Sequence, residues 1–272
     1  MKTISAIVIT KNEEMHIESC IKSLQQFADE VIIYDSMSTD RTEEIATSLG
    51  AKFIPTPNFP GYGPQRINAQ KHATCDFIFF LDSDERVTPE LATEIKEFVA
   101  NAKDNEVLAI PRENYVLGQK IMHCGYYPDH VMRLYCNSYT TYNDALVHEK
   151  IIVKKDTVIK YAKNNLIHHT YLTYDSLLTK NIRYSEAWAR DRFQKNKKCR
   201  FFVTPFIKGT FNFFYKYFIR LGILDGKMGL IISLISAFYT FNKYFALYSF
   251  KYEAKALENI KKDISVKELK KN

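Results

Sequence analysis

Short apolar runs alternate with helical patterns along the first hundred residues. The apolar runs predict strands, and they lie at residues 4–10, 30–35, 51–54 and 77–81. Helical apolar spacing or helix-start signals mark the segments between and after them, at residues 13–26, 40–49 and from 88 onward. Such alternation predicts an α/β domain whose mostly parallel sheet is covered by helices on both faces.

Individual residues indicate where these helices begin and end. Asp40 is placed to cap the second helix, and Gly50 is placed to end it, because glycine readily adopts the left-handed conformation found after helices. Thr88 and Pro89 predict the next helix start, with the threonine as cap and the proline in the first helical position. These signals agree with the strand–helix alternation.

The pattern becomes irregular after residue 105. Three short strands are expected there, at Val107–Ile110, Val131–Tyr135 and Ile151–Val153. From about Tyr174 onward the pattern is helical, and no internal repeat is visible. The sequence therefore predicts a sheet domain over residues 1–172 and a helical region over residues 173–272.

Two aspartates directly follow the apolar strand of residues 77–81. Asp82 and Asp84 point to the same side if the extended backbone continues that far, because side chains alternate along a strand. A hard divalent cation takes oxygen ligands of this kind and often shares them with a diphosphate. A solvated acidic turn is the alternative interpretation of these two residues.

Polar residues follow two other predicted strands as well. Asn12 and Glu13 come after the strand of residues 4–10, and Asp35 ends the strand of residues 30–35. In parallel α/β sheets, ligands bind beyond the carboxyl ends of the strands. Polar residues at three strand ends therefore predict a ligand site at that edge of the sheet.

Composition and charge narrow the class of protein. The chain is 46% hydrophobic and 25% charged, as in globular proteins, and its five cysteines without a Cys-x-x-Cys pair indicate a reducing compartment. The start of the chain is not typical of a signal peptide, since its apolar run is short and Lys11 follows at once. The net charge of +7 is local, because residues 192–224 contain eight Lys and Arg and no acid. A global nucleic-acid interpretation of the high pI is therefore not supported.

Aromatic and basic residues are interleaved between residues 192 and 252. The longest uncharged run, Met228 to Asn242, is 15 residues, shorter than the ~20 that a spanning helix needs. An aromatic, basic stretch of this kind is typical of helices that lie in the surface of an anionic membrane. The alternatives are core helices whose lysines reach water and, less favoured, a single-stranded nucleic-acid surface, for which no recognised fold is present.

Seven short segments carry a family resemblance. Three lie near the N-terminus: Ile9-Thr-Lys-Asn-Glu-Glu14, Tyr34-Asp-Ser-Met-Ser-Thr-Asp40 and Leu81-Asp-Ser-Asp-Glu-Arg86. The other four are Gly61-Tyr-Gly-Pro-Gln-Arg-Ile-Asn68, Gly125-Tyr-Tyr-Pro-Asp129, Arg133-Leu-Tyr135 and Val147-His-Glu149. The first three resemble the inverting family-2 glycosyltransferases of the GT-A fold. The other four are similar to the subgroup that adds β-linked glucose to lipopolysaccharide core. The resemblance covers residues 3 to 170 and, more loosely, the helical C-terminus.

This resemblance implies roles for the strand-end residues. Asp35 would accept a hydrogen bond from uracil, Glu13 would lie near the base or ribose, and Thr10 and Asn12 share the first motif. Asp84 would bind Mg²⁺ or Mn²⁺, with Asp82 as a second ligand or in contact with the ribose or a metal-bound water. The cation would stabilise the departing diphosphate. For Asp35, a turn-forming role is the alternative.

Two arginines have both a substrate role and a structural alternative. Arg66 lies in a segment rich in Gly and Pro that could close as a loop over the diphosphate, with Gln65 and Asn68 beside it. Its alternative is a surface position at a helix start. Arg86 is expected to pair with nearby carboxylates rather than with substrate.

An inverting displacement needs a general base on the acceptor side, which we place in residues 106–155. The resemblance favours Glu149, with Asp144 and Asp129 as rivals and His148 as a residue that orients the base or touches the diphosphate. His168 and His169 are interpreted as packed or hydrogen-bonding side chains, because no cysteine or third histidine lies at zinc-ligand spacing.

The sequence thus predicts a peripheral enzyme on the cytoplasmic face of the inner membrane. It would transfer a hexose, glucose from UDP-glucose, to a sugar hydroxyl of a lipid-anchored glycan such as lipopolysaccharide core. A polyprenyl phosphate or a protein is the alternative acceptor. A sugar nucleotidyltransferase is disfavoured because residues 10–14 are not a Gly-rich phosphate loop. The non-enzyme alternative is a membrane scaffold with a degenerate nucleotide fold.

Overall fold

The computed structural model describes residues 2–146, 149–197, 199 and 201–269. The chain divides into two compact units, Met1–Tyr115 with Tyr126–Thr170, and Val116–Gly125 with Tyr171–Asn272. The boundary after Thr170 lies two residues before the expected one at residue 172. The segment Val116–Gly125, which the sequence placed in the sheet domain, belongs to the second unit.

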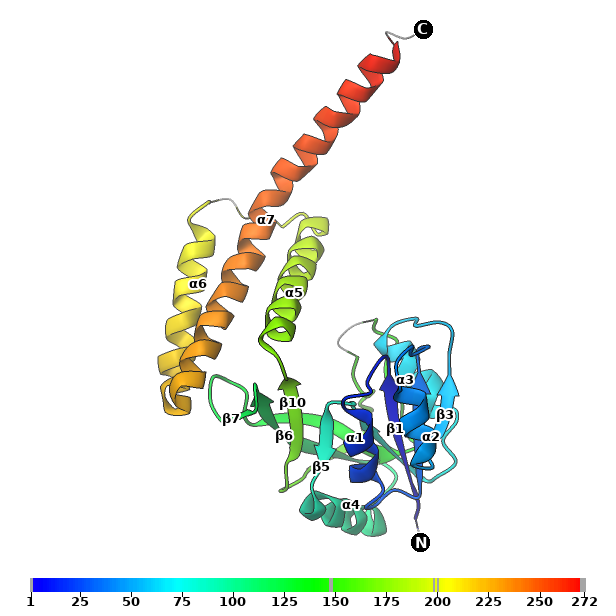
Figure 1. Cartoon of the computed structure of the whole chain (residues 1–272). Coiled ribbons are helices and arrows are strands. Elements are labelled where there is room, and N and C mark those ends of the chain that lie inside the picture. The colour runs from blue at the N-terminus through cyan, green and yellow to red at the C-terminus, as the bar shows by residue number, and fades with distance from the viewer. Residues whose placement is uncertain (1, 147–148, 198, 200, 270–272) are drawn as a thin grey trace. The chain divides into compact units, whose positions relative to one another are not determined.

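The first unit is built on a mixed sheet with the strand order β3-β2-β1-β4-β8-β6-β10-β5 (Figure 1). Its parallel part consists of β1 Ile4–Thr10, β2 Glu30–Asp35, β3 Lys52–Pro55 and β4 Phe77–Leu81. Thr10 is opposite Asp35 in this register, so the carboxyl ends of β1 and β2 coincide. The four predicted N-terminal strands are therefore confirmed, with β3 shifted by one residue.

The remaining strands make the sheet less parallel than predicted. They are β5 Glu85–Val87, β6 Glu106–Val116, β8 Asp129–Cys136, β9 Val158–Tyr161 and β10 Leu166–Tyr171. β8 is antiparallel to both β4 and β6, and β10 is antiparallel to β5. The expected strand Ile151–Val153 does not form, and only an isolated bridge joins Ile151 to Tyr142.

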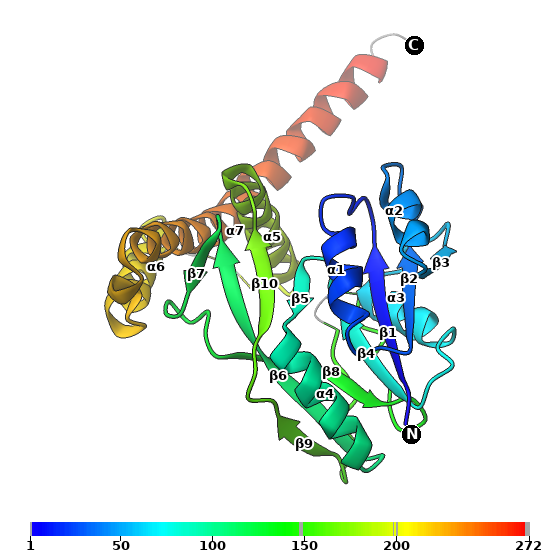
Figure 2. The ribbon, with the colours of Figure 1, turned by 60° about the horizontal axis from the view of Figure 1, so that its bottom comes forward.

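Helices cover both faces of this sheet, as predicted (Figure 2). They are α1 Ile17–Leu24, α2 Thr42–Ser48, α3 Tyr62–Gln70 and α4 Pro89–Asn101. Side-chain alternation along β1 divides the core, because Ala6 and Val8 pack with α1, α2 and α4 while Ile7 packs on the side of α3. β4 is buried along its whole length, so the residues that follow it start from a fixed position.

The helix-start signals were largely correct. Thr88 caps α4 by accepting a hydrogen bond from the backbone N–H of Leu91 at 3.2 Å. Asp40 accepts from the N–H of Thr42 at 3.0 Å, although the residue directly before α2 is Arg41. The first helix begins at Ile17 rather than at residue 13, because the preceding residues form a turn.

The second unit is helical, as predicted for the C-terminal region. It contains β7 Gln119–Ile121, α5 Tyr174–Gln194, α6 Thr204–Phe214, the π-helical turn η1 Tyr215–Ile219, the 3₁₀ turn η2 Gly222–Asp225 and α7 Gly226–Leu269. α7 packs lengthwise against both α5 and α6 (Figure 1). The segment Gly222–Phe250, which begins in η2 and continues in α7, is long and apolar enough to cross a membrane by length and composition. The uncharged run of 15 residues in the sequence therefore underestimates the length of the apolar segment.

Candidate active site

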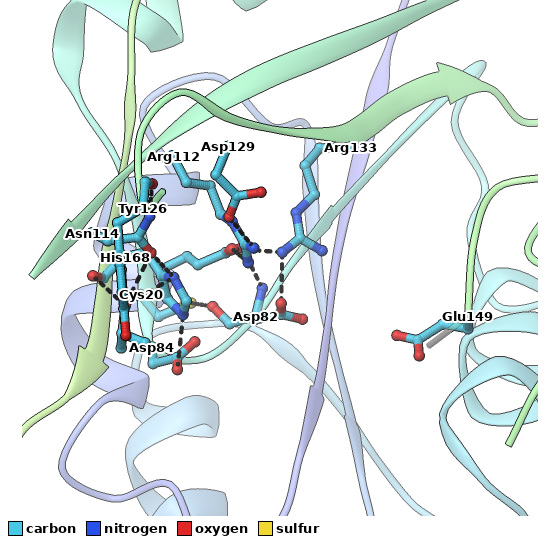
Figure 3. A network of polar contacts seen from close by, with 12 residues as sticks. Cys20, Asp82, Asp84, Arg112, Asn114, Tyr126, Asp129, Arg133, Glu149 and His168 are labelled. Carbon is cyan, nitrogen blue, oxygen red and sulfur yellow. Dashed lines mark hydrogen bonds and ion pairs between the residues drawn. The ribbon is translucent and has the colours of Figure 1, made fainter. Parts of the chain in front are cut away.

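Asp82 stands at the end of β4 between two buried arginines. Nη2 of Arg66, from α3, donates to its Oδ1 at 2.5 Å, and Nη2 of Arg133, from β8, donates to its Oδ2 at 2.6 Å (Figure 3 shows Asp82 with Arg133). Burial alone would raise the pKa of Asp82, but Arg133 and Arg66 outweigh it and hold this pKa well below its usual range. Asp82 is therefore a fixed anion with both oxygens occupied.

The two arginines extend this contact into a longer ion network. Arg66 also donates from Nε to Oε1 of Glu149 at 2.9 Å, and Arg133 donates to Oε1 of Glu85 at 2.6 Å. Cations and anions alternate along the network, which we call the charge ladder: Glu149, Arg66, Asp82, Arg133, Glu85, Arg112, Asp129. The ladder links α3, the end of β4, β5, β6 and β8, and it holds the side chain of Glu149 near Asp82.

Two nitrogen atoms of the ladder are buried without a partner among the described residues. They are Nη1 of Arg66 and Nε of Arg133. Both guanidinium groups are nearly inaccessible, with residues 66 and 133 only 3% and 5% exposed. Because buried donors are normally bonded, these two atoms are positions at which a polar ligand atom would be stabilised.

Asp84 faces a different group from Asp82. The backbone turns after Leu81, and the N–H of Glu85 donates to the carbonyl of Asp82 at 2.9 Å. Hence the extended geometry, on which a common direction of the two aspartates depended, does not continue to Asp84. Oδ2 of Asp84 lies 3.4 Å from Nε2 of His168 (Figure 3).

Asn114 fixes the orientation of the His168 ring. Its Nδ2 donates to the carbonyl of Tyr126 at 2.7 Å, so its Oδ1 faces Nδ1 of His168 at 2.7 Å. Nδ1 therefore carries a proton, and Nε2 faces the carboxylate of Asp84. An unprotonated imidazole nitrogen and a carboxylate oxygen are a pair of ligand atoms suited to a divalent cation.

Glu13 lies beside Asp84 in a largely buried position. Burial raises the pKa of its carboxyl to about 7; a hydrogen bond from Ser83 opposes this shift, and the charges of Asp84 and Asp40 add to it. The charge of Arg86 opposes it too. Near neutral pH Glu13 is thus balanced between its two protonation states, as expected of a group in a functional site.

This raised pKa predicts that Glu13 destabilises the protein as pH rises. The folded state keeps the Glu13 proton between pH 4.5 and about 7, whereas the unfolded chain loses it, so stability falls across this window. In EDTA, Glu13→Gln should therefore raise the unfolding free energy at pH 8 but not at pH 4. We expect about 1 kcal/mol rather than the full linkage value, because the carboxyl keeps some contact with solvent. Thermal unfolding across pH measures it. Glu43→Gln, at an exposed position, is the control. If stability depended on pH in the same way in wild type and Glu13→Gln, the raised pKa of Glu13 would be contradicted.

Arg86 supports the turn after β4 rather than pairing with carboxylates. Its guanidinium donates to the carbonyls of Ser83 and Glu85, both at 2.6 Å, and to the hydroxyl of Ser19 at 2.8 Å. A further bond goes to the carbonyl of His16. Among the described residues, Arg86 therefore forms none of the expected ion pairs with local carboxylates.

The end of β2 forms a closed polar turn around Asp35. Its carboxylate accepts from the hydroxyl of Thr10 at 2.7 Å and from the N–H of Ser38 at 2.6 Å. Asn12 adopts a left-handed conformation with φ of 55°, which lets its N–H donate to the hydroxyl of Ser38 at 2.7 Å. These contacts are those of the turn-forming alternative. The nucleotide role of Asp35 stays a prediction.

The segment with Arg66 is a helix against the sheet, not a loop over it. The guanidinium lies between the rings of Phe80 and Tyr142, 5.3 and 5.1 Å from their centroids, so the surface and lid interpretations of Arg66 are both wrong. A Cβ on Gly63 would lie 2.3 Å from the carbonyl of Asn143, so glycine is required for this close approach.

The neighbours of Arg66 on α3 have separate contacts. Nε2 of Gln65 donates to the hydroxyl of Ser36 at 3.1 Å, while its Oε1 is buried without a partner among the described residues. Oδ1 of Asn68 accepts from Lys71 at 2.9 Å. Gln65 therefore faces the turn around Asp35, which places it beside the expected nucleotide.

The acceptor-side candidates are not equivalent. Glu149 joins the charge ladder with its side chain 14% exposed, Asp129 pairs with Arg112, and Asp144 is exposed. His148 lies outside the described residues. The sequence pattern assigned no role to Glu85, Arg112, Arg133 or Asn114. The interpretation of His168 as a hydrogen-bonding side chain is confirmed by its contact with Asn114. Only the Arg133-Leu-Tyr135 segment offered a signal, as part of the resemblance.

A parallel sheet with acidic residues beyond its carboxyl edge, continued by antiparallel strands, is the arrangement expected of the GT-A fold. Residues 5–221 match the model of Glycosyl transferase family 2. The chain belongs to this family.

Two curated relatives support the assignment over most of the chain. An uncharacterized glycosyltransferase of Rickettsia bellii is 32% identical over 254 residues, covering 88% of this chain and 84% of the relative. The lipopolysaccharide core biosynthesis glycosyltransferase LpsC of Rhizobium meliloti is 28% identical over 250 residues, covering 88% and 89%. Among solved structures, glucosyl-3-phosphoglycerate synthase of Mycobacterium tuberculosis in complex with Mn²⁺, UDP and glucosyl-3-phosphoglycerate is 27% identical, with a TM-score of 0.35 over 42% of this chain and 44% of that chain.

Proposed function

We propose that this glycosyltransferase transfers a hexose, glucose from UDP-glucose, with inversion to a sugar hydroxyl of a lipid-anchored bacterial surface glycan. The observation that carries the proposal is the pair of aspartates beyond β4, of which Asp82 is held by two buried arginines and Asp84 faces His168. Similarity to LpsC over nearly the whole chain supports a lipopolysaccharide core acceptor.

The donor nucleotide is assigned to the ends of β1 and β2. Asp35 is buried, and its hydrogen bonds from Thr10 and Ser38 orient the carboxylate that would accept the uracil N–H. The buried Oε1 of Gln65 is a second acceptor beside this turn. Both side chains accept hydrogen bonds, as recognition of the uracil N–H requires.

Asp84 and His168 are the residues that would hold the divalent cation. The described residues contain no group of three or more metal-ligating side chains. Two protein ligands nevertheless suit Mg²⁺ or Mn²⁺, because such ions commonly complete their shell with water and substrate phosphates. Asp82 accepts one arginine hydrogen bond at each oxygen and keeps further lone pairs, so it stays the second candidate ligand. When bound, the cation would supply Lewis-acid stabilisation of the departing diphosphate.

Glu149 is assigned as the base. Inversion requires the acceptor O–H to be deprotonated as its oxygen forms the bond to the anomeric carbon and the bond to the diphosphate breaks. Arg66 engages Oε1 of Glu149, so Oε2 is the oxygen assigned to take the proton. The exposed Asp144 has no comparable connection to Asp82 in the described part of the chain.

Release of UDP from a panel of UDP-, GDP- and dTDP-sugars, with Mn²⁺, Mg²⁺ or EDTA, tests the proposal. Metal-dependent turnover of UDP-glucose is expected, since slow hydrolysis of the donor proceeds without an acceptor. With a lipopolysaccharide core acceptor, the same assay decides the base: Glu149→Gln should lower transfer and leave donor binding intact, whereas Asp144→Asn should change neither. A panel without turnover and without metal-dependent binding would refute the enzyme and favour the membrane scaffold.

The lipid-anchored acceptor places the enzyme at the cytoplasmic face of the inner membrane. Supporting this location are the eight Lys and Arg of residues 192–224 and the apolar segment Gly222–Phe250. Cations near an anionic leaflet contribute about 1 kcal/mol each. The second unit therefore supplies the surface that would hold the enzyme beside its acceptor.

A further inference from the structure

Large apolar side chains are exposed along α6 and the turn that follows it. Six of them are between 48% and 71% exposed: Phe206, Ile207, Phe211, Phe214, Phe218 and Ile219. Leu234 and Phe238 on the neighbouring α7 are 52% and 45% exposed. So many exposed aromatic and aliphatic side chains on two adjacent helices indicate a binding surface. We call this surface the α6–α7 face.

The third helix of the unit has a different surface. α5 carries exposed ion pairs one turn apart, Arg190 with Glu186 and Lys195 with Asp191. Such pairs are typical of a helix that faces water. On α5, exposed apolar side chains such as Ile182 are thus interspersed with ion pairs.

The charge of the α6–α7 face indicates what binds to it. Residues 192–224 contain eight basic residues and no acid, and the charged residues of α6 and the turn that follows it are Lys208 and Lys216. A second copy of this chain would bring the same cations to the contact, and like charges would then oppose association. An anionic lipid surface supplies both an apolar layer and negative phosphates.

Lys243 is the charged residue that interrupts the apolar sequence of α7 between Met228 and Phe250. Its ammonium lies 5.0 Å from the ring of Trp188 on α5 and 5.1 Å from that of Tyr239. Aromatic rings therefore hold this cation against α5. As a result, the charge of Lys243 is directed to α5 and does not divide the apolar surface of α7.

Lys208 indicates how the two helices are oriented. It is exposed in the middle of α6, directly after Phe206 and Ile207. On a helix parallel to the membrane surface, a lysine reaches the phosphates with its long side chain. On a helix across the membrane, the same charge would lie in hydrocarbon. Residues 204–219 also extend only about 24 Å at 1.5 Å per residue, less than the ~30 Å of hydrocarbon.

We infer that the α6–α7 face lies flat on an anionic lipid bilayer, with its apolar side chains at the boundary of headgroups and acyl chains and with Lys208 and Arg220 on lipid phosphates. The inference rests on the membrane location in the proposed function and names the surface and orientation by which it is achieved. It does not depend on the identity of the donor sugar.

Flotation of the full chain with lipid vesicles tests the inference. Binding to phosphatidylglycerol vesicles should exceed binding to pure phosphatidylcholine vesicles at least tenfold, and high salt should reduce the difference. The double variant Ile207→Ser with Phe211→Ser should lower partitioning at least tenfold, because both side chains leave water on binding. Ile182→Ser on α5, with a side chain 52% exposed, is the matched control and should bind as wild type does.

Three results would overturn the inference. Equal binding of the double variant and wild type would show that another surface meets the lipid. Bound protein that resists alkaline carbonate would show a helix across the membrane. A wild-type dimer that ignores vesicles and dissociates in the double variant would assign the face to a second copy. UDP release measured without vesicles separates these outcomes from failure of the enzymatic proposal, because it reports the sheet unit alone.

Discussion

Asp84→Ala is expected to reduce metal-dependent turnover of the donor at least about a thousandfold, since it removes the carboxylate assigned to hold the cation at the leaving diphosphate. The fold should survive, because the Asp84 side chain is 30% exposed and faces His168 at 3.4 Å without belonging to the charge ladder. UDP release with saturating Mn²⁺ measures the loss, and Mn²⁺ titration calorimetry should show binding lost in parallel.

A second readout distinguishes this role from a structural one. The charge of Asp84 contributes to the raised pKa of Glu13, so Asp84→Ala should lower that pKa and slightly raise stability at pH 8 in EDTA. Asp104→Ala, at an exposed position, is the control and should retain turnover. Unchanged metal-dependent turnover in Asp84→Ala would remove Asp84 from the site.

The parallel half of the sheet could be predicted from sequence because its signals are local. β1, β2 and β4 are apolar runs bounded by polar residues, and each begins and ends where the pattern indicated. Thr88 and Pro89 likewise specify a helix start from two adjacent residues. The polar ends of these strands then follow from the parallel register, in which Thr10 is opposite Asp35.

The antiparallel half lacked such signals. β9 is exposed along its length and β5 has three residues, so neither forms an apolar run that would indicate a strand. Ile151–Val153 has the composition of a strand but makes a single bridge, because composition alone does not provide a pairing partner. Strand pairing in this region depends on tertiary neighbours rather than on local propensity.

The ion network was beyond sequence reasoning for a related reason. Arg133 and Asp82 are separated by 51 residues, and Arg66 and Glu149 by 83. No spacing rule connects residues so distant. Asp82 could be recognised as an acidic residue at a strand end, but its bonds to Arg66 and Arg133 could not. Lys243 is a similar case, since its contact with Trp188 turns an apparent break in α7 into an internal contact.

Replacing Arg133 should lower the free energy of unfolding more than any other substitution proposed for this protein. Arg133→Met keeps the apolar volume but leaves Asp82 and Glu85 facing each other without their shared cation, and Glu85 is 0% exposed. Breaking a buried pair in this way costs about 3–5 kcal/mol, because Asp82 then keeps only Arg66 and the buried Glu85 keeps only Arg112, at 3.3 Å. Urea unfolding should show a lower midpoint with an unchanged slope.

The double variant Arg133→Met with Glu85→Gln tests whether charge is the cause. Neutralising Glu85 should recover part of the lost unfolding free energy. The double variant should therefore be less destabilised than the sum of the two single variants. Arg41→Met provides the surface control, since Arg41 pairs with Glu44 where both side chains are about two-thirds exposed, and there we expect less than about 0.5 kcal/mol. If Arg133→Met lowered the unfolding free energy no more than Arg41→Met, the charge ladder would not be a buried ionic network. The description of Asp82 as a fixed anion would then be wrong.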